Sequence, residues 1–401
     1  MITVLFLIAV ISMASCSGPG NQEIIVKNGP RLGLVTATEA VINWDTFPEY
    51  RGAVSYRVAG EAEFKGKALS GEVTNRQSVT INNLKPKTKY EYLIEGDQTV
   101  WSFTTATTDT ASFVFVTMAD NRGQSDTEDL IGLPVAFINI INDAVKRDSV
   151  FAVNAGDLFY GKNPNIDTFR KLYHSFKTAI HPLASKIPYY ISPGNHEMSP
   201  FTSSSHTPGF DPVQLFNTEI HQPAQLEGYE GTVFSWNYGK VHFVSIATNQ
   251  FNPLVLTPLH AMYYVSDAQI SWLDKDLKKA KIDGAEFIFV FGHANAFRDP
   301  AWPDAGDLGD LEYTDIAQRD KFWNVLVANQ VNAYICGHRH FFDVSTHGGV
   351  VQWMNGNSGS VVGGPNQYTV WTVNGTLKTV TAELVDDTGT KDPTKTRTFT
   401  K

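Results

Sequence analysis

The chain has 401 residues, of which 42% are hydrophobic and 18% charged, a size that allows two or three globular domains. Its net charge is −9, with 41 Asp and Glu against 32 Lys and Arg, and it contains no Lys- or Arg-rich run. An acidic surface repels nucleic acid and anionic lipid. The composition therefore excludes a protein that binds nucleic acid or a membrane surface through bulk charge.

The N-terminal residues have the composition of a targeting segment. Residues 2–15 form an apolar run without a charge, too short to span a bilayer. Small residues then lead to Cys16 and polar residues follow, which resembles a bacterial lipoprotein cleavage site. We therefore expect residues 1–21 to be a signal peptide and tether, the protein to be exported to the periplasm or cell surface, and Cys16 to be lipidated as its only membrane anchor. The alternative is an ordinary signal peptide with an incidental cysteine.

Residues 22–106 show short alternating runs separated by turns rich in Gly, Asn, Pro and Lys, a spacing typical of a β-sandwich. Trp44 and Tyr90 are expected in the core between its two sheets. Residues 84–90 resemble a late turn and strand of a fibronectin type III domain, so the sandwich is predicted to be of this immunoglobulin-like kind. It would act as a spacer or as a wall beside the next domain.

From residue 107 to 401 the pattern predicts a single α/β domain, because apolar strand-like runs alternate with longer helical stretches. The expected strands are residues 113–119, 150–155, 189–193, 241–247, 286–291 and 331–336. The expected helices are residues 134–146, 168–184, 267–281 and 314–330. The later strand-like runs, residues 349–354 and 368–384, are expected to extend a second sheet.

Five motifs follow these apolar runs, each near the end of an expected strand. In chain order they contain Asp120, then Asp157 and Tyr160, then Asn195 and His196, then His293, then His338 and His340. Ligands of open α/β sheets bind at the carboxyl ends of the strands, so we expect these side chains at one edge of a sheet. Their oxygen and nitrogen donors suit Zn, Fe or Mn rather than a soft thiolate site. Two cations about 3.5–4 Å apart need a bridging carboxylate, and Asp157 is the natural bridge.

The ordered set resembles the calcineurin-like metallophosphoesterases. With the preceding sandwich and Tyr160, it is most similar to the purple acid phosphatase branch of that family. Residues 232–245 and 269–273 also fit that branch. The resemblance implies a four-layer α/β domain in which two packed mixed sheets are flanked by helices. It also implies a pair of metal ions, bound as follows. One metal would take Asp120, Asp157, Tyr160 and His340, and the other would take Asp157, Asn195, His293 and His338.

The resemblance also assigns roles around the metals. His196 would lie near the phosphate, as a proton donor to the leaving group or as a contact to the phosphoryl oxygens, and Asn195 would face the substrate as well as a metal. Glu197 and His242 fit better as supporting or packing residues.

The first motif departs from the family pattern, because Arg122 stands where many members have a histidine and the purple acid branch commonly has a glycine. A guanidinium has no lone pair to give, so Arg122 is not a ligand. Tyr160 then becomes the best fourth ligand of its metal, although a core tyrosine is the alternative. Arg122 would clamp a phosphate oxygen or, equally, form a surface salt bridge.

A second departure follows His293, where the purple acid enzymes usually carry another histidine near the substrate. Residues 294–337 contain none. Arg298 is the nearest replacement as a substrate contact, and a solvated loop arginine is the alternative.

The predicted function is hydrolysis of small phosphate monoesters by a metal-activated hydroxide. Phosphodiesters or nucleotides are the close alternative, since the long loops 198–230 and 251–266 would shape the cleft. Two readings from other classes stay open: a non-catalytic surface-anchored binding protein, and a structural zinc site without turnover.

Overall fold

The structure is a computed structural model that describes residues 23–162, 165–198, 211–249, 263–298, 310–360 and 362–401. Cys16 and the expected leader lie outside these residues, as do parts of the two long loops. Among the helices in the described ranges, none combines the length and the apolar character that a membrane crossing requires.

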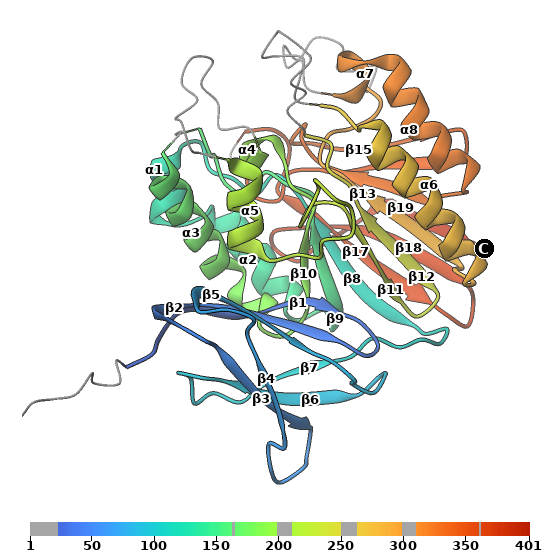
Figure 1. Ribbon diagram of the computed structural model, residues 1–401. Coiled ribbons are helices and arrows are strands. Elements are labelled where there is room, and N and C mark those ends of the chain that lie inside the picture. Colours follow the sequence, from blue (N-terminus) through green and yellow to red (C-terminus); the bar gives the residue numbers. More distant parts are fainter. Residues whose placement is uncertain (1–22, 163–164, 199–210, 250–262, 299–309, 361) are drawn as a thin grey trace, which may run out of the picture.

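The first seven strands form a β-sandwich of two antiparallel sheets, drawn in blue shades in Figure 1. One sheet has the order β1-β2-β5, with β1 (Ile25–Val35), β2 (Ala40–Tyr50) and β5 (Thr74–Ile81). The other has the order β4-β3-β6-β7, with β4 (Gly66–Leu69), β3 (Ala53–Val58), β6 (Lys89–Ile94) and β7 (Trp101–Thr104). Trp44 and Tyr90 are buried in the core between the sheets, as predicted.

The rest of the chain builds two six-stranded mixed sheets. The first has the order β10-β9-β8-β17-β18-β19, with β10 (Tyr189–Ile191), β9 (Ser149–Asn154), β8 (Phe113–Met118), β17 (Gln367–Asn374), β18 (Thr379–Asp386) and β19 (Lys391–Thr400). The second has the order β11-β12-β13-β14-β16-β15, with β11 (Phe234–Tyr238), β12 (Val241–Ser245), β13 (Phe287–Phe291), β14 (Ala333–Cys336), β16 (Val350–Asn355) and β15 (Phe342–His347). β8, β9 and β10 run parallel to one another, as do β12, β13, β14 and β16.

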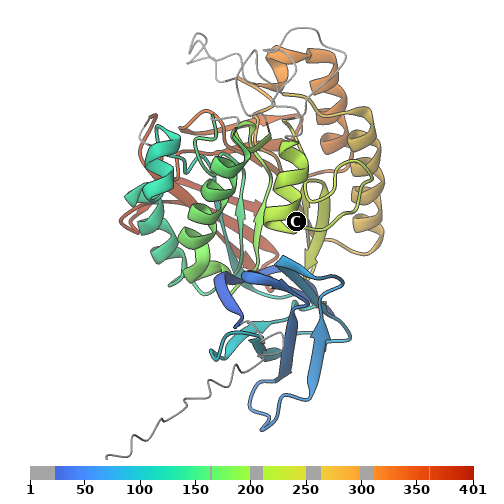
Figure 2. The same ribbon diagram turned by 60° about the vertical axis from the view of Figure 1, so that its left-hand side comes forward.

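Helices cover the outer faces of both sheets, which gives the four layers that the family resemblance implied (Figures 1 and 2). On the first sheet lie α1 (Asp126–Ile131), α2 (Val135–Ala144), α3 (Ile166–Ala184), α4 (Asn195–Met198) and α5 (Pro212–Ile220). On the second lie α6 (Asp267–Ile282), α7 (Leu311–Thr314) and α8 (Ile316–Ala328). The sheets pack face to face through an aromatic core that includes Phe115, Phe243, Phe289 and Trp371.

Two topological predictions were wrong. The strands that carry the motifs do not share one sheet, because β8, β9 and β10 lie in the first sheet and β13 and β14 in the second. The run 368–384 does not extend the second sheet; it forms the β17–β18 hairpin, and β17 pairs antiparallel with β8 of the first. Hydrophobic alternation indicates how a strand is buried and not which strand it pairs with, so the pattern did not contain this information.

The sandwich contacts the first sheet's side of the α/β region. In Figure 1, β1, β2 and β5 face α3 and β10, and β1 contacts both of these elements. The backbone N–H of Val35 donates to the hydroxyl of Tyr190, which joins β1 to β10 at 3.3 Å.

Candidate metal centre

The predicted ligands lie in the turns that follow β8, β9, β10, β13 and β14, at the rim where the carboxyl ends of both sheets meet. Four of them have left-handed backbones, with φ of 57° at Asp120, 58° at Asp157, 79° at His338 and 55° at His340. Asp and His tolerate this region better than most residues, and strained backbones concentrate at functional sites. These turns lift each side chain out of its strand direction and aim it across the rim.

Two glycines allow the turns to approach one another. Gly156 has a φ of 93°, and a Cβ atom there would lie 2.4 Å from the backbone nitrogen of Gly194. A Cβ atom on Gly194 would lie 2.3 Å from Oδ1 of Asp157. The glycines therefore let the β9 and β10 turns bring Asp157 and Asn195 together.

Four of the side chains converge as one set, which we call the Asn195 group: Asp157, Asn195, His293 and His338. His293 Nε2 lies 3.2 Å from Asp157 Oδ1 and 3.1 Å from Asn195 Oδ1, and His338 Nδ1 lies 3.1 Å from the same amide oxygen. Ligands at about 2.0–2.1 Å from a tetrahedral ion are themselves about 3.3 Å apart. The spacing of the Asn195 group is therefore close to that of a preformed cation site.

The tautomer of His293 suits this role. Its Nδ1 lies 2.6 Å from the carbonyl oxygen of Ala155, so this nitrogen is the one that donates to the backbone. The Nε2 atom is thereby directed at Asp157 and Asn195, which is how a backbone carbonyl orients a metal-binding histidine. The backbone N–H of His293 donates to the hydroxyl of Thr248, which fixes the turn.

The second set, the Asp120 group, consists of Asp120, Asp157 and His340, whose ligand atoms all lie within 4.8 Å of one another. His340 Nδ1 lies 3.0 Å from the carbonyl oxygen of Val362, which leaves Nε2 facing Asp120 Oδ1 at 3.5 Å. Asp120 Oδ2 accepts from the backbone N–H of His338, but Oδ1 is buried without a hydrogen-bond partner. A buried acceptor without a partner is costly, and a cation at this position would satisfy it.

Two of the ionisable groups at the rim have strongly shifted pKa values. Burial raises the pKa of Asp120 to about 8, and the nearby Asp157 carboxylate adds to the rise. Burial alone would lower the pKa of His293, but Asp157 and Asp120 raise it to about 9. The protonated imidazole of His293 thus supplies part of the positive charge beside the Asp120 and Asp157 carboxylates. It does so at the position where the ligand spacing suits a metal ion.

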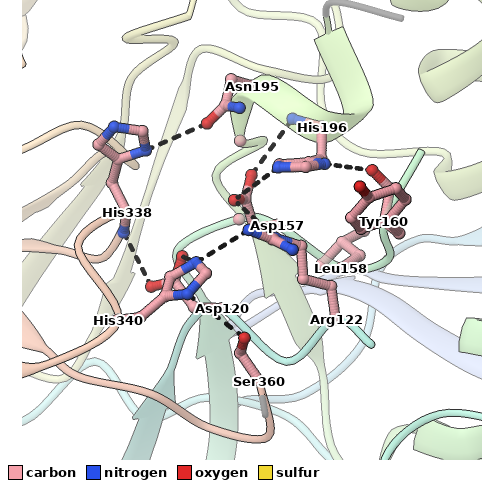
Figure 3. A network of polar contacts seen from close by, with 12 residues as sticks. Asp120, Arg122, Asp157, Leu158, Tyr160, Asn195, His196, His338, His340 and Ser360 are labelled. Atoms are coloured by element: carbon pink, nitrogen blue, oxygen red, sulfur yellow. Dashed lines mark hydrogen bonds and ion pairs between the residues drawn. The ribbon is translucent and has the colours of Figure 1, made fainter. Parts of the chain in front are cut away.

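Asp157 belongs to both groups, which is the position predicted for a bridging carboxylate. Figure 3 shows it at the centre of the site. Two ions on either side of one carboxylate are the arrangement that phosphoester-cleaving two-metal sites use.

Arg122 and Tyr160 lie beside the Asp120 group. The Arg122 guanidinium reaches into the site, with Nε 3.6 Å from Asp157 Oδ2 and Nη2 3.4 Å from His340 Nε2. The ring of Tyr160 lies on the other side of this guanidinium, with its centre 5.5 Å from the Arg122 Cζ atom (Figure 3). Arg122 therefore stands between Tyr160 and His340.

His196 lines the same space from α4. Its Nδ1 donates to the carbonyl oxygen of Tyr160, and its Nε2 lies 3.6 Å from Asp157 Oδ2. Burial lowers the pKa of His196 to about 4, with Arg122 adding to the fall and Asp157 opposing it. Only a protonated Nε2 can donate to a leaving group, and in this structure burial disfavours that form.

Arg298 and His242 have partners of their own. Arg298 Nε donates to Asp310 Oδ2 at 2.7 Å, and the backbone N–H of Arg298 donates to Oε2 of Glu312. His242 lies between Asn237 and Asp276, at 2.7 and 2.8 Å. The second arrangement supports the expectation that His242 is a packing residue.

Three further residues support the site, and of these the sequence indicated only Glu197. Glu197 accepts three backbone N–H groups, from Asp157, Leu158 and Gly194, and so joins the β9 and β10 turns. Asp129 accepts from the N–H of Gly123 and of Tyr160, which fixes the loops on either side of the Arg122 guanidinium.

Ser360 is the third. Its hydroxyl lies 3.3 Å from His340 Nδ1, and its N–H donates to the carbonyl oxygen of Asp120. It lies in the Gly, Asn and Ser turn after β16, and the rule that polar residues after an apolar run face the site would have found it. No comparable signal marked Asp129, which lies inside a short helix.

Comparison with known proteins agrees with this geometry. The sequence profile of the calcineurin-like phosphoesterases matches residues 127–342, more than half of the chain, and the match begins after Asp120 and Arg122. Purple acid phosphatase 21 of Arabidopsis thaliana is 25% identical over 266 residues, which are 66% of this chain and 52% of that protein. Acid phosphatase type 7 of Mus musculus is 24% identical over 287 residues, 67% of this chain and 57% of that protein. The chain thus spans little more than half the length of these relatives.

Two solved structures share the fold over nearly the whole chain. The purple acid phosphatase PPD1 from yellow lupin (Lupinus luteus) seeds superposes with a TM-score of 0.70 at 13% identity, covering 94% of this chain and 75% of that one. PhoD gives a TM-score of 0.68 at 12% identity, covering 96% of this chain and 92% of that one. The profile match, supported by these likenesses of fold, shows that the chain belongs to the calcineurin-like phosphoesterase family.

Proposed function

We propose that the protein is a two-metal phosphoesterase that hydrolyses small phosphate monoesters in the manner of the purple acid phosphatases. The observation that supports this most strongly is the sharing of Asp157 between the Asn195 group and the Asp120 group. The names of the relatives, which include purple acid phosphatases, point to the same reaction. The acidic surface fits a small substrate better than a nucleic acid.

In this proposal the Asn195 group holds one cation and the Asp120 group holds the other, with Tyr160 as a further ligand of the second. When bound, the two ions would polarise the phosphoryl oxygens and lower the pKa of water, whichever of zinc, iron or manganese they are. Asp157 would be shared by the two positions. The carbonyl oxygens of Ala155 and Val362 keep His293 and His340 turned toward them.

The remaining side chains at the rim would bind the substrate. His196 presents Nε2 toward Asp157 and would contact the phosphoryl oxygens or protonate the leaving group, since an anionic ester would favour its charged form. The amide of Asn195 and the guanidinium of Arg122 would also contact the phosphate. Arg298, tied to Asp310, would act from the loop that follows His293.

The test is hydrolysis of an aryl phosphate by protein reconstituted with zinc, iron or manganese, with metal content measured on the same samples. Asp157→Asn removes charge from both groups and should lower the rate by at least about a thousandfold, because the ions supply several kcal/mol of transition-state stabilisation. His196→Ala should lower the rate about a hundredfold or more with the metals retained. Undiminished hydrolysis in Asp157→Asn would contradict the proposal, and so would a wild-type chain that binds no metal. An aryl phosphodiester measured alongside separates the two ester classes.

We also propose that residues 22–106 form a domain of the fibronectin type III kind and residues 107–401 the catalytic domain. Support comes from Tyr90, the second residue of β6, whose hydroxyl accepts from the backbone N–H of Lys85 at 2.9 Å. A tyrosine that bonds back to the preceding turn in this way is typical of immunoglobulin-like sandwiches. A fragment of residues 22–106 that folds on its own would support the division, and one that stays unfolded would argue against it.

We further propose export and lipidation at Cys16, on the composition of residues 2–21. Expression in a bacterial host with a radiolabelled fatty acid tests this. Label in the wild-type chain and its loss in Cys16→Ser would support the proposal, whereas an unlabelled wild-type chain would contradict it.

A further inference from the structure

Arg122 is the residue at the rim that the proposed function does not fully explain. Its Nη2 lies 3.4 Å from Nε2 of His340, and the other ring nitrogen of His340 already donates to the carbonyl oxygen of Val362. Nε2 of His340 is therefore the acceptor in the contact with Arg122. A cation can use this lone pair only if the guanidinium gives it up.

The guanidinium also lies 3.6 Å from Asp157 Oδ2, so it contacts two of the three members of the Asp120 group. Its charge acts as a partial replacement for a metal ion, because it is the nearest permanent positive charge to the carboxylates. Two positive charges a few ångströms apart repel strongly in a buried site. The guanidinium and a cation in the Asp120 group are therefore mutually exclusive in this arrangement.

Arg122 is held loosely for so buried a residue. Its Nε has no hydrogen-bond partner, and its contacts to Gly123, His340 and Asp157 are all 3.4–3.6 Å long. Arg76, in the interface with the sandwich, is similarly buried, with 22% of its side chain exposed against 14% for Arg122. Yet Arg76 makes bonds of 2.6–2.9 Å to Glu219 and Asn75. Few good hydrogen bonds would be lost if Arg122 moved.

The backbone around Arg122 is fixed, so only the side chain is free to move. The side chain of Asn121 donates to the carbonyl oxygen of Leu158, and the N–H of Gly123 donates to Asp129. The Tyr160 ring already lies beside the guanidinium and offers a surface for it outside the Asp120 group.

We propose that Arg122 makes the two cation sites unequal: the Asn195 group binds a cation first and tightly, and the Asp120 group binds one only when that cation displaces the guanidinium. This inference rests on the proposed function. It makes Arg122 a positioning residue that sets how many metal ions the chain carries at a given concentration. Turnover by the two-metal site would then depend on the metal supply at the weaker position.

The experiment is a calorimetric titration of the metal-stripped full chain with zinc alone, with the bound zinc counted by elemental analysis. The wild-type chain should show one tight and one weak site. Arg122→Gln should tighten the weak site about ten- to a hundredfold, the range that neighbouring residues contribute to metal affinity, and leave the tight site unchanged. Arg122→Lys keeps the positive charge but has fewer hydrogen-bond donors. Its affinity for zinc at the weak site should lie between those of the wild-type chain and Arg122→Gln.

The matched control is Arg170→Gln, which removes an arginine that is 47% exposed on α3 and should leave both affinities unchanged. Two zinc sites whose affinities are the same in the wild-type chain and in Arg122→Gln would overturn the inference. If Arg122→Gln does not fold, a weak site in Arg122→Lys no tighter than in the wild-type chain overturns it as well. Failure of the proposed function itself looks different, because then neither the wild-type chain nor any variant binds zinc.

Discussion

Two buried clusters of charge in this chain are built in opposite ways. Where the sandwich meets the α/β region, Lys177 of α3 pairs with both Asp45 of β2 and Glu219 of α5, and Arg76 of β5 binds Glu219 at 2.6 Å. At the metal centre, Asp120 keeps an oxygen without a partner and Arg122 makes only long contacts. In the first cluster both carboxylates form close ion pairs with Lys or Arg, although Arg31 Nη2 has no hydrogen-bond partner. In the second, the ion pairs of Asp120 and Asp157 with Arg and His are 3.2 Å or longer.

The pKa values of the carboxyl groups differ between the two clusters. Burial alone would raise the pKa of Asp45, but Arg31 and Lys177 hold it below its usual value, and Lys177 and Arg76 do the same for Glu219. Burial raises the pKa of Asp120 to about 8, and the opposing charges of His293 and Arg122 do not offset this rise. Breaking a closely paired buried cluster is costly, whereas a cluster of loosely paired groups with shifted pKa values is a candidate ligand site.

The largest effect is expected when the cluster between the sandwich and the α/β region is broken. Lys177→Met should lower the free energy of unfolding by about 3–5 kcal/mol, because it removes the one cation that pairs with both buried carboxylates. Chemical denaturation of the metal-stripped chain measures this. Lys278→Met removes a lysine that is 63% exposed and paired with Asp274 on α6, and it should change stability by less than about 0.5 kcal/mol. Equal effects of the two substitutions would contradict the contrast.

The same cluster should give a pH dependence of known sign. The folded-state pKa of Glu219 lies below the ordinary value of 4.5, so its contribution to stability is present above about pH 4.5 and is lost as the pH falls through the folded-state value. Glu219→Gln should therefore cost about 3 kcal/mol at pH 7 and progressively less below pH 4.5. Unfolding free energies of both proteins across this range test it. A cost that stays constant down to pH 3 would rule out the ionised pair as its source.

At the metal centre the sharper test is Glu197→Gln. Oε1 of Glu197 accepts from Leu158, and Oε2 accepts from both Asp157 and Gly194. The amide of Gln would turn an N–H toward a backbone N–H at one of these positions. We expect zinc affinity to fall about ten- to a hundredfold, as for other residues that orient ligands. Glu128→Gln, on an exposed glutamate of α1, is the control for the loss of charge. Unchanged zinc binding in Glu197→Gln would show that the turns hold their positions without it.

The smallest effect is expected from Ser360→Ala. The hydroxyl is the weaker of two contacts to His340 Nδ1, because the carbonyl oxygen of Val362 lies closer, at 3.0 Å against 3.3 Å (Figure 3). Losing a neutral hydrogen bond costs about 0.5–1.5 kcal/mol, so zinc affinity of the Asp120 group should fall about two- to tenfold. The Asn195 group should keep its affinity, and an equal loss at both sites would mean that Ser360 supports the rim as a whole.

The sequence was sufficient to predict that these side chains converge, because each follows a strand and parallel strands bring their carboxyl ends to one rim. The expected convergence of Asp157, Asn195 and His293 is what the structure has. The core positions of Trp44 and Tyr90 were also predictable, since bulky residues at alternating positions face the interior of a sandwich.

Other features could not be predicted from the sequence. The division of the strands between two sheets depends on pairing partners, such as β17 beside β8, which lie far apart in sequence. The chemistry of its guanidinium excludes Arg122 as a ligand, but its place between His340 and Tyr160 depends on three separate loops. Asp129 is inconspicuous in sequence, because one acidic residue in a helix is usually exposed and here it is buried.

The central claim is that Asp157 is shared by two cation positions, and anomalous X-ray scattering from crystals soaked in zinc tests it most directly. The account predicts two peaks about 3.5–4 Å apart, one on each side of the Asp157 carboxylate. One would be bounded by Asn195, His293 and His338, and the other by Asp120 and His340. Peaks that lie away from Asp157, or a single peak at saturating zinc in both the wild-type chain and Arg122→Gln, would contradict it.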